Sequence, residues 1–247
     1  MHRYQILIEY VGTNFIGWQI QSEGQSVQKL IQTKISKLLK EKINLVGSGR
    51  TDSGVHAIEQ SAHFDCKKRI ENLGKFLQSI NYFLNIKLIS IINIKKKNLK
   101  FHARFSAKQR IYTYIIFNRI SRPSIEKNRG WHIRKKLDLE LMKKSAKKLL
   151  GTNDFSTFRS SNCNAKSPIR TIKSVKIKKV KNKIQIQFKS QSFLQQQVRS
   201  MVGCLKYVAE KKWSLKKFEK IFKSKKRILN NAPPAPAHGL FLEKIIY

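Results

Sequence analysis

Strand-like and helix-like segments interleave in both halves of the chain, and their order constrains the fold more than any other feature. The first half has strand patterns at 4–9, 62–66, 89–94 and 110–117 and amphipathic helical patterns at 26–40 and 76–84. The second half has strand patterns at 172–180, 184–188 and 240–247 and helical patterns at 138–150, 193–209 and 215–222. Neither half alternates strictly, as a parallel β/α fold would. We therefore expect an α+β fold, with a mixed or antiparallel sheet and helices packed on one side.

The two halves have a similar layout, although no repeat is visible in the sequence itself. A stretch from Arg119 to Arg129 is the best candidate for a connection between them. This predicts domains at 1–118 and 119–247. A chain of 247 residues, 40% of them hydrophobic, is long enough to bury a proper core.

The charge balance is strongly basic, with 52 Lys and Arg against 14 Asp and Glu and a formal net charge of +38. A field of this sign attracts polyanions and speeds their encounter with the protein. The alternative explanation of the excess charge is an A/T-rich coding bias that favours lysine codons, in which case the lysines only keep the surface solvated. Even then, a protein with this charge binds nucleic acid to some degree.

No pattern in the sequence indicates a metal site or a cofactor. The three cysteines, Cys66, Cys163 and Cys204, are widely spaced, and the histidines show no paired helical spacing. The glycine-rich stretch at 47–54 lacks the Gly-Lys-Ser/Thr of a phosphate loop. The chain opens on a strand pattern and has no apolar run of membrane-spanning length. We expect a cytoplasmic protein with no cofactor, no metal and no membrane contact.

Asp52 is the best candidate for a catalytic carboxylate among only four aspartates. It lies in a tight glycine-rich turn directly after Arg50 and Thr51, and such a turn brings backbone close to a ligand. The alternative is a turn aspartate bonded to its own backbone. His56, close by in sequence, is a candidate substrate contact, although a structural role is the more common one.

Aromatic and cationic residues alternate between 101 and 114, in the sequence FHARFSAKQRIYTY. This mixture suits base stacking beside phosphate contacts. The alternative is a strand whose aromatic residues belong to the core. Residues on one face of a strand repeat every second position, so Tyr112 and Tyr114 share a face. Only one end of that face can line a site, and we expect Tyr114 to belong to the core.

Six motifs in order along the chain resemble the tRNA pseudouridine synthase A family. They are EYVGTNFIGWQ at 9–19 with SVQ at 26–28, GRTDSGVH at 49–56, FHARFSA at 101–107 with RIYTY at 110–114, NDFSTF at 153–158, SFLQQQVRSMVG at 192–203 and APAHGL at 235–240. One such likeness is weak, but six in register are specific.

The resemblance implies isomerisation of uridine to pseudouridine in the anticodon stem-loop of tRNA, at about positions 38, 39 and 40, where the target base leaves the stack. It also implies a homodimer and two ferredoxin-like halves that share one mixed, mostly antiparallel sheet, with a basic cleft between them. By position, Asp52 is the catalytic aspartate, and Tyr112 is the active-site tyrosine. Arg199 falls on the basic residue that pairs with the aspartate, and Arg50 falls on the loop arginine beside the flipped base.

Without the resemblance, the residues leave two alternative functions to consider. A non-catalytic RNA-binding protein, ribosomal or similar to an RNA-recognition module, would account for the charge and the aromatic residues. It has no need of an aspartate among cations, however, because a negative charge there weakens phosphate binding. A hydrolase using Asp52 on a phosphodiester would require a metal and a second carboxylate nearby, and the sequence offers neither.

The charge predicts a steep dependence of tRNA binding on salt. If about six phosphates are neutralised, affinity should fall roughly a thousandfold between 50 and 200 mM salt, because binding releases counterions. Filter binding or fluorescence anisotropy over a salt series measures the slope. A flat response would instead mean that the excess of lysine reflects coding bias.

Overall fold

The computed structural model describes residues 1–247 and divides into two compact units. Unit 1 is Met1–Lys108 together with Phe241–Tyr247, and unit 2 is Gln109–Leu240. The boundary expected from the sequence, after residue 118, lies ten residues further along the chain and did not include the return of the C-terminal strand. The expected connection at Arg119 to Arg129 lies inside unit 2. None of the helices is both long and apolar enough to span a membrane.

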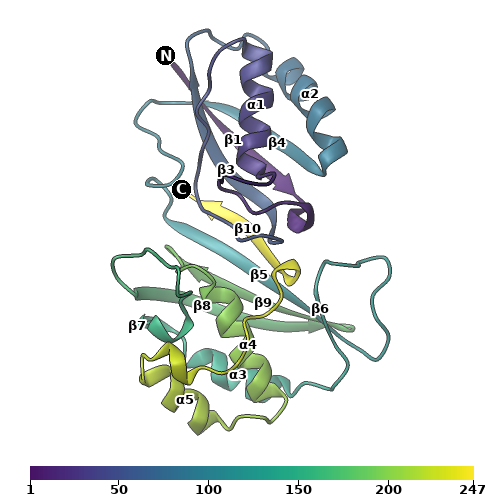
Figure 1. Ribbon diagram of the computed structural model, residues 1–247, viewed down its shortest axis with the longest axis vertical. Coiled ribbons are helices and arrows are strands. Elements are labelled where there is room, and N and C mark those ends of the chain that lie inside the picture. Colours follow the sequence, from purple (N-terminus) through teal and green to yellow (C-terminus); the bar gives the residue numbers. More distant parts are fainter. The chain divides into compact units, whose positions relative to one another are not determined.

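Unit 1 is a sheet with two α-helices (Figure 1). Its elements are β1 (His2–Tyr10), η1 (Gly12–Asn14), α1 (Val27–Leu39), β2 (Val46–Gly47), β3 (His56–Cys66), α2 (Leu73–Leu84), η2 (Asn85–Lys87), β4 (Ile89–Lys97) and β10 (Leu240–Ile246). The strands lie in the order β4-β1-β3-β10, and β2 also pairs with β3. The β1 pairings are antiparallel, whereas β10 runs parallel to β3.

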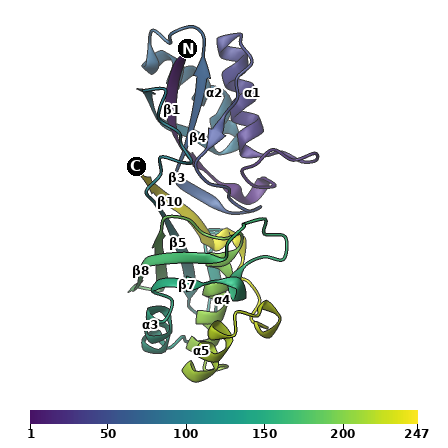
Figure 2. The same cartoon turned by 90° about the vertical axis from the view of Figure 1, so that its left-hand side faces the viewer.

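One face of the unit 1 sheet carries the helices. In β1 the side chains of Tyr4, Ile6, Ile8 and Tyr10 are buried, and the alternate Glu9 is exposed. Figure 2 shows α1 and α2 on the same side of these strands. The N-terminus of α1 is capped, because the Ser26 side chain accepts a hydrogen bond from the Lys29 amide.

Unit 2 has the same class of architecture, built from later elements. They are β5 (Gln109–Asn118), β6 (Trp131–Ile133), α3 (Leu139–Lys147), β7 (Gly151–Asp154), η3 (Ser156–Phe158), β8 (Ile169–Val180), β9 (Lys183–Ser190), α4 (Gln197–Ala209), α5 (Leu215–Lys223), η4 (Arg227–Leu229) and η5 (Ala237–Gly239). Its strands lie in the order β5-β9-β8-β7, with antiparallel pairings, and β6 pairs parallel to β5. Both units therefore confirm the α+β class with mixed, mostly antiparallel pairing. The shared sheet and the basic cleft stay predictions.

The alternation read from the sequence of β9 is confirmed. Ile184, Ile186 and Phe188 are fully buried, while the glutamines between them are only half-buried. β8 pairs antiparallel with this strand across the turn near Asn182. The core of unit 2 lies between this face and the helices, whose buried residues include Met201, Leu205 and Phe218.

Two expected helices are shorter than their patterns indicate. The helix expected from 193 begins only at Gln197, because Gln196 has a left-handed conformation with φ of 60°. The Gln197 side chain also accepts a hydrogen bond from the Leu194 amide, which fixes a turn ahead of the helix. The helix expected to reach residue 150 ends at Lys147, and Gly151, with φ of 87°, then starts β7.

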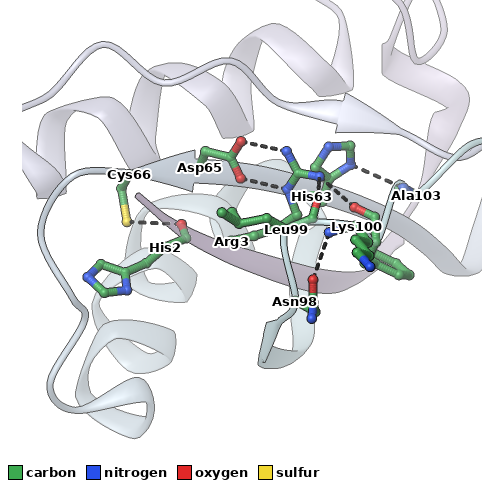
Figure 3. A network of polar contacts seen from close by, with 10 residues as sticks. His2, Arg3, His63, Asp65, Cys66, Asn98, Leu99, Lys100 and Ala103 are labelled. Carbon is green, nitrogen blue, oxygen red and sulfur yellow. Dashed lines mark hydrogen bonds and ion pairs between the residues drawn. The ribbon is translucent and has the colours of Figure 1, made fainter.

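An ion pair between Arg3 and Asp65 joins β1 to β3 at one end of the unit 1 sheet (Figure 3). The guanidinium donates from Nε and Nη2 to the two carboxylate oxygens, at 2.7 Å each. This hydrogen bonding holds the pKa of Asp65 below its ordinary value. Beside it, burial, helped by the positive charge of Arg3, lowers the pKa of His63 from 6.5 to about 4. His63 is therefore neutral at pH 7 and accepts a hydrogen bond from the Ala103 amide.

The low pKa of His63 makes stability depend on pH. The unfolded chain protonates this side chain near pH 6.5 and the folded chain only near pH 4, so the free energy of unfolding should fall as pH is lowered between these values. His63→Gln, which stays neutral throughout, should lose this part of the fall. Urea unfolding over the same pH range measures it. The other titrating groups are common to both proteins, so parallel curves would contradict the prediction.

Candidate active site

The turn that carries Asp52 is held by the segment that follows β1. The Val55 amide donates to the Asp52 carbonyl at 3.1 Å, which closes the turn. The residue before it, Thr51, accepts a hydrogen bond on its carbonyl from the Trp18 amide at 3.1 Å. The Thr51 hydroxyl lies 2.8 Å from the hydroxyl of Tyr10. Asp52 is half-buried and thus follows directly after a residue fixed through both its backbone and its side chain.

Gly17 allows this segment to approach the Asp52 turn closely. Its φ is 114°, and a Cβ placed there would lie 2.6 Å from the Thr51 carbonyl oxygen. A side chain is therefore excluded both by conformation and by space. The Ser53 hydroxyl adds a hydrogen bond to the Phe15 carbonyl at 3.1 Å. The N-terminal motif at 9–19 and the motif at 49–56 consequently form one packed structure.

Arg50 lies two residues before Asp52 and is exposed. Its Nε donates to the side-chain oxygen of Gln19 at 3.2 Å. The backbone at the start of the turn is held separately, because the Gln60 side chain donates to the Gly49 carbonyl at 2.7 Å. The guanidinium of Arg50 therefore stands at the surface beside the carboxylate-bearing turn, where a polyanion can reach it.

His56, the other candidate in this motif, is 1% exposed. Its Nδ1 accepts a hydrogen bond from the Gly12 amide at 3.0 Å. The ring stacks on Phe241 of β10, with centroids 4.7 Å apart and an interplanar angle of 27°. These contacts give the imidazole a structural role at the start of β3. Contact with substrate stays a prediction.

In unit 2, Tyr112 and Tyr114 lie on β5 and differ in their surroundings. Tyr114 is fully buried, as expected, and its hydroxyl donates to the Pro236 carbonyl at 2.8 Å. Burial raises the pKa of this hydroxyl. Tyr112 is 7% exposed, and its ring meets Phe193 edge-on, with centroids 5.3 Å apart. Phe193 therefore orients the Tyr112 ring.

Arg199 lies in the first turn of α4 and is half-buried. Its Nε donates to the Ala235 carbonyl at 2.8 Å, and the Ala235 amide donates to the Arg199 carbonyl at 3.0 Å. Gly203 makes this approach possible, because a Cβ there would lie 2.2 Å from the Pro233 carbonyl oxygen. The neighbour that approaches α4 at Gly203 is the proline-rich segment before β10. The Ala235 carbonyl in that segment therefore fixes the orientation of the Arg199 side chain.

Sequence reasoning missed the residues that hold the candidates in place. The contacts from Tyr10 to Thr51 and from Ala235 to Arg199 join motifs that were recognised only one by one. The sequence did carry a signal for these contacts. Each motif that supplies a residue holding a candidate in place also contains a glycine or a proline. Nowhere does the structure gather three His, Cys, Asp or Glu side chains in a position to hold a metal ion.

Comparison with known proteins decides the family. A family model described as tRNA pseudouridine synthase matches residues 6–106 and 145–247. The chain belongs to this family. A protein of Pelagibacter ubique (strain HTCC1062) named tRNA pseudouridine synthase A is 75% identical over all of both chains. Its namesake from Paramagnetospirillum magneticum (strain ATCC 700264 / AMB-1) is 40% identical over all of this chain and 96% of its own.

A likeness among solved structures is weak. A crystal structure of a Cbf5-Nop10-Gar1 complex matches with a TM-score of 0.33 and 10% identity, over 82% of this chain and 53% of that chain. This chain thus spans about half the length of that one, and the likeness carries no argument. Membership of the family is shown by the family model and by the relatives in sequence. As a member, the chain is an isomerase that acts in tRNA pseudouridylation.

Gly17 supplies a test of how the Asp52 turn is held. Gly17→Ala should push the Thr51 carbonyl away from its position. On the expectation that Asp52 is the catalytic carboxylate, the single-turnover rate of pseudouridine formation should fall by about 10- to 100-fold, because small displacements of a catalytic group are costly. Gly24→Ala is the matched control, since Gly24 also has a positive φ, of 78°, but faces only the side chain of Ile16. Rates and melting temperatures of both variants are compared. Equal rates in the two variants would show that Gly17 does not position Asp52.

Proposed function

We propose that this protein converts uridine to pseudouridine in the anticodon stem-loop of tRNA, with Asp52 as its catalytic carboxylate and without a cofactor. The observation that carries the proposal is the rigid hold on Thr51, directly before Asp52, through hydrogen bonds to Trp18 and Tyr10. A carboxylate that must meet one atom of a bound nucleotide requires such a fixed backbone. Membership of the family supplies the reaction.

The reaction suits a single carboxylate. The glycosidic bond between C1′ and N1 of the uridine breaks, the uracil turns, and a bond forms between C1′ and C5. No redox change occurs and no water is consumed. Asp52 acts by one of two routes, attacking C1′ as a nucleophile or removing a proton from C2′. Both routes require the ionised carboxylate beside the sugar of a base that has left its stack.

The other site residues have complementary roles in the proposal. Tyr112 stacks on the uracil, and its hydroxyl oxygen accepts the proton that leaves C5 at the end of the reaction while its own proton passes to solvent. Phe193 supports this stacking by fixing the ring of Tyr112 edge-on. Arg50, which is exposed next to the turn, binds the RNA beside the flipped nucleotide.

Arg199 is the proposed partner of Asp52 in the reaction. Its side chain is half-buried and aimed by the Ala235 carbonyl, so it presents a fixed positive charge rather than a mobile one. A homodimer that works in the cytoplasm is part of the same proposal, on the strength of the resemblance described above. His56 contributes by fixing the Gly12 turn, and any contact with the tRNA is secondary to that.

The proposal is tested by mapping pseudouridine in tRNA transcripts incubated with the pure protein in the presence of a chelator. Wild type should modify the anticodon stem-loop. Asp52→Asn should form no detectable product, yet should bind tRNA as tightly or more tightly, because a negative charge has been removed from a basic surface. Binding is measured separately by fluorescence anisotropy.

Asp154→Asn is the matched control, because Asp154 lies in unit 2 and its side chain only accepts a hydrogen bond from the Ser156 amide, which asparagine can also accept. It should modify tRNA at the wild-type rate. Product formed by Asp52→Asn would refute the catalytic role of Asp52. Modification confined to other parts of the tRNA would refute the anticodon stem-loop as the target.

A further inference from the structure

An exposed aromatic side chain stands at the tip of the turn between β4 and β5. Phe105 is 76% exposed, although it lies between Ala103, which is fully buried, and Ala107, which is 5% exposed. Its ring packs against His102, with centroids 4.4 Å apart. The guanidinium of Arg104 lies 5.6 Å from the ring centroid. An aromatic surface flanked by a cation is thus displayed to solvent.

The turn itself is closed by its own hydrogen bonds. The His102 amide donates to the Ser106 hydroxyl, and the Ser106 amide donates back to the His102 carbonyl, both at 2.9 Å. Nδ1 of His102 accepts from the amides of Arg104 and Phe105, at 3.2 Å and 3.3 Å. A backbone held in this way presents the Phe105 ring with little loss of freedom on binding.

The partly buried polar network of Figure 3 ties the turn to the sheet. The Arg3 side chain binds Asp65 through Nε and Nη2. Its third nitrogen, Nη1, donates to the carbonyls of Leu99 and Phe101, at 2.6 Å and 2.7 Å. His63 accepts from the Ala103 amide, as described above. The Tyr247 hydroxyl donates to the Ala103 carbonyl at 2.9 Å. Charged and aromatic groups from three strands or their ends therefore fix this one surface turn.

The chemistry around the ring indicates a nucleobase as its partner. Bases stack on aromatic side chains and on guanidinium planes, and this stacking is used for unpaired nucleotides of RNA. Besides Arg104, the local cations are Lys97, whose ammonium lies 5.2 Å from the Phe101 ring, and the exposed Lys100. These suit the phosphates on either side of a stacked base.

We propose that Phe105, supported by His102 and Arg104, is a stacking platform for an unpaired base of the RNA substrate, separate from the nucleotide that reacts at Asp52. This proposal rests on the proposed function, because it takes tRNA as the RNA that binds. It adds a second point of contact, one that contributes to binding and not to the chemical step.

A second copy of the chain is the other occupant to consider for an exposed aromatic ring. Charge favours RNA, because the segment from Lys95 to Lys108 carries six Lys and Arg side chains and no carboxylate. The carboxylate of Asp65, which lies in the same network, is paired with Arg3. The oligomeric state is measured alongside binding so that this alternative has its own outcome.

The test compares Phe105→Ala with Tyr82→Ala, because Tyr82 is a surface aromatic on α2 with the same exposed fraction of 76%. Phe105→Ala should weaken the binding of tRNA by about 5- to 150-fold, the range that stacking of one base implies. It should raise KM while leaving the single-turnover rate at saturating tRNA unchanged. Phe105→Trp, which keeps a stacking face, should bind as wild type does, and so should Tyr82→Ala.

The outcomes separate this proposal from the proposed function. If the wild-type protein forms no pseudouridine, the proposed function fails, whereas the binding comparison can still be made with tRNA alone. If wild type is active and Phe105→Ala binds tRNA with wild-type affinity, the stacking platform is refuted. Sedimentation that shows Phe105→Ala dissociating into smaller species, with affinity per protomer unchanged, would assign the ring to contact between copies and overturn the proposal.

Discussion

Backbone packed directly on backbone is the constraint on which the candidate site depends. The segment from Gly12 to Trp18 lies against the Asp52 turn so closely that Gly17 has no space for a Cβ. Side chains then add hydrogen bonds to a contact that the main chain has already made, as Tyr10 does to Thr51. Such a contact leaves the turn few alternative positions. A carboxylate needs this to act on one atom of a large and flexible nucleic acid.

The same device recurs in unit 2, where it positions a cation instead of a carboxylate. Gly203 brings α4 against the main chain at Pro233, and the carbonyl of Ala235 then receives the Arg199 side chain. In both units, a segment distant in sequence fixes a candidate site residue, or the residue directly before it, through main-chain atoms. Because the contacts use main-chain atoms, the side chain of the residue that makes them matters less than the glycine that lets the two segments approach.

The sequence was sufficient for the class of fold and for most elements, because these follow from short-range periodicity. The strand pattern at 184–188 predicted β9, and the helical pattern from residue 26 predicted α1. The start of α4 was missed because it depends on the left-handed conformation of Gln196, which no periodicity announces. β6 was missed because it has only three residues.

For the site, residue types and motif order indicated Asp52, but they gave no account of how it is held. Hydrogen bonds between residues 41 positions apart, such as Tyr10 and Thr51, leave no trace in local pattern. The return of the C-terminal strand to unit 1 leaves no local pattern either. Strand β10 joins β3 through a parallel pairing at Phe241 and His56, and a parallel partner can come from anywhere in the sequence.

The place of β10 in unit 1 also affects the order in which the protein is assembled on the ribosome. Domains generally fold during synthesis from the N-terminal end, as each becomes available. Here the strand that pairs with β3 is translated after the whole of unit 2, and so is Tyr247, whose hydroxyl reaches Ser61 and Ala103. Unit 1 therefore waits while unit 2 is being made, with the edge of β3 still unpaired at His56 and Ala57. Translation that stopped a few codons early would leave that edge open.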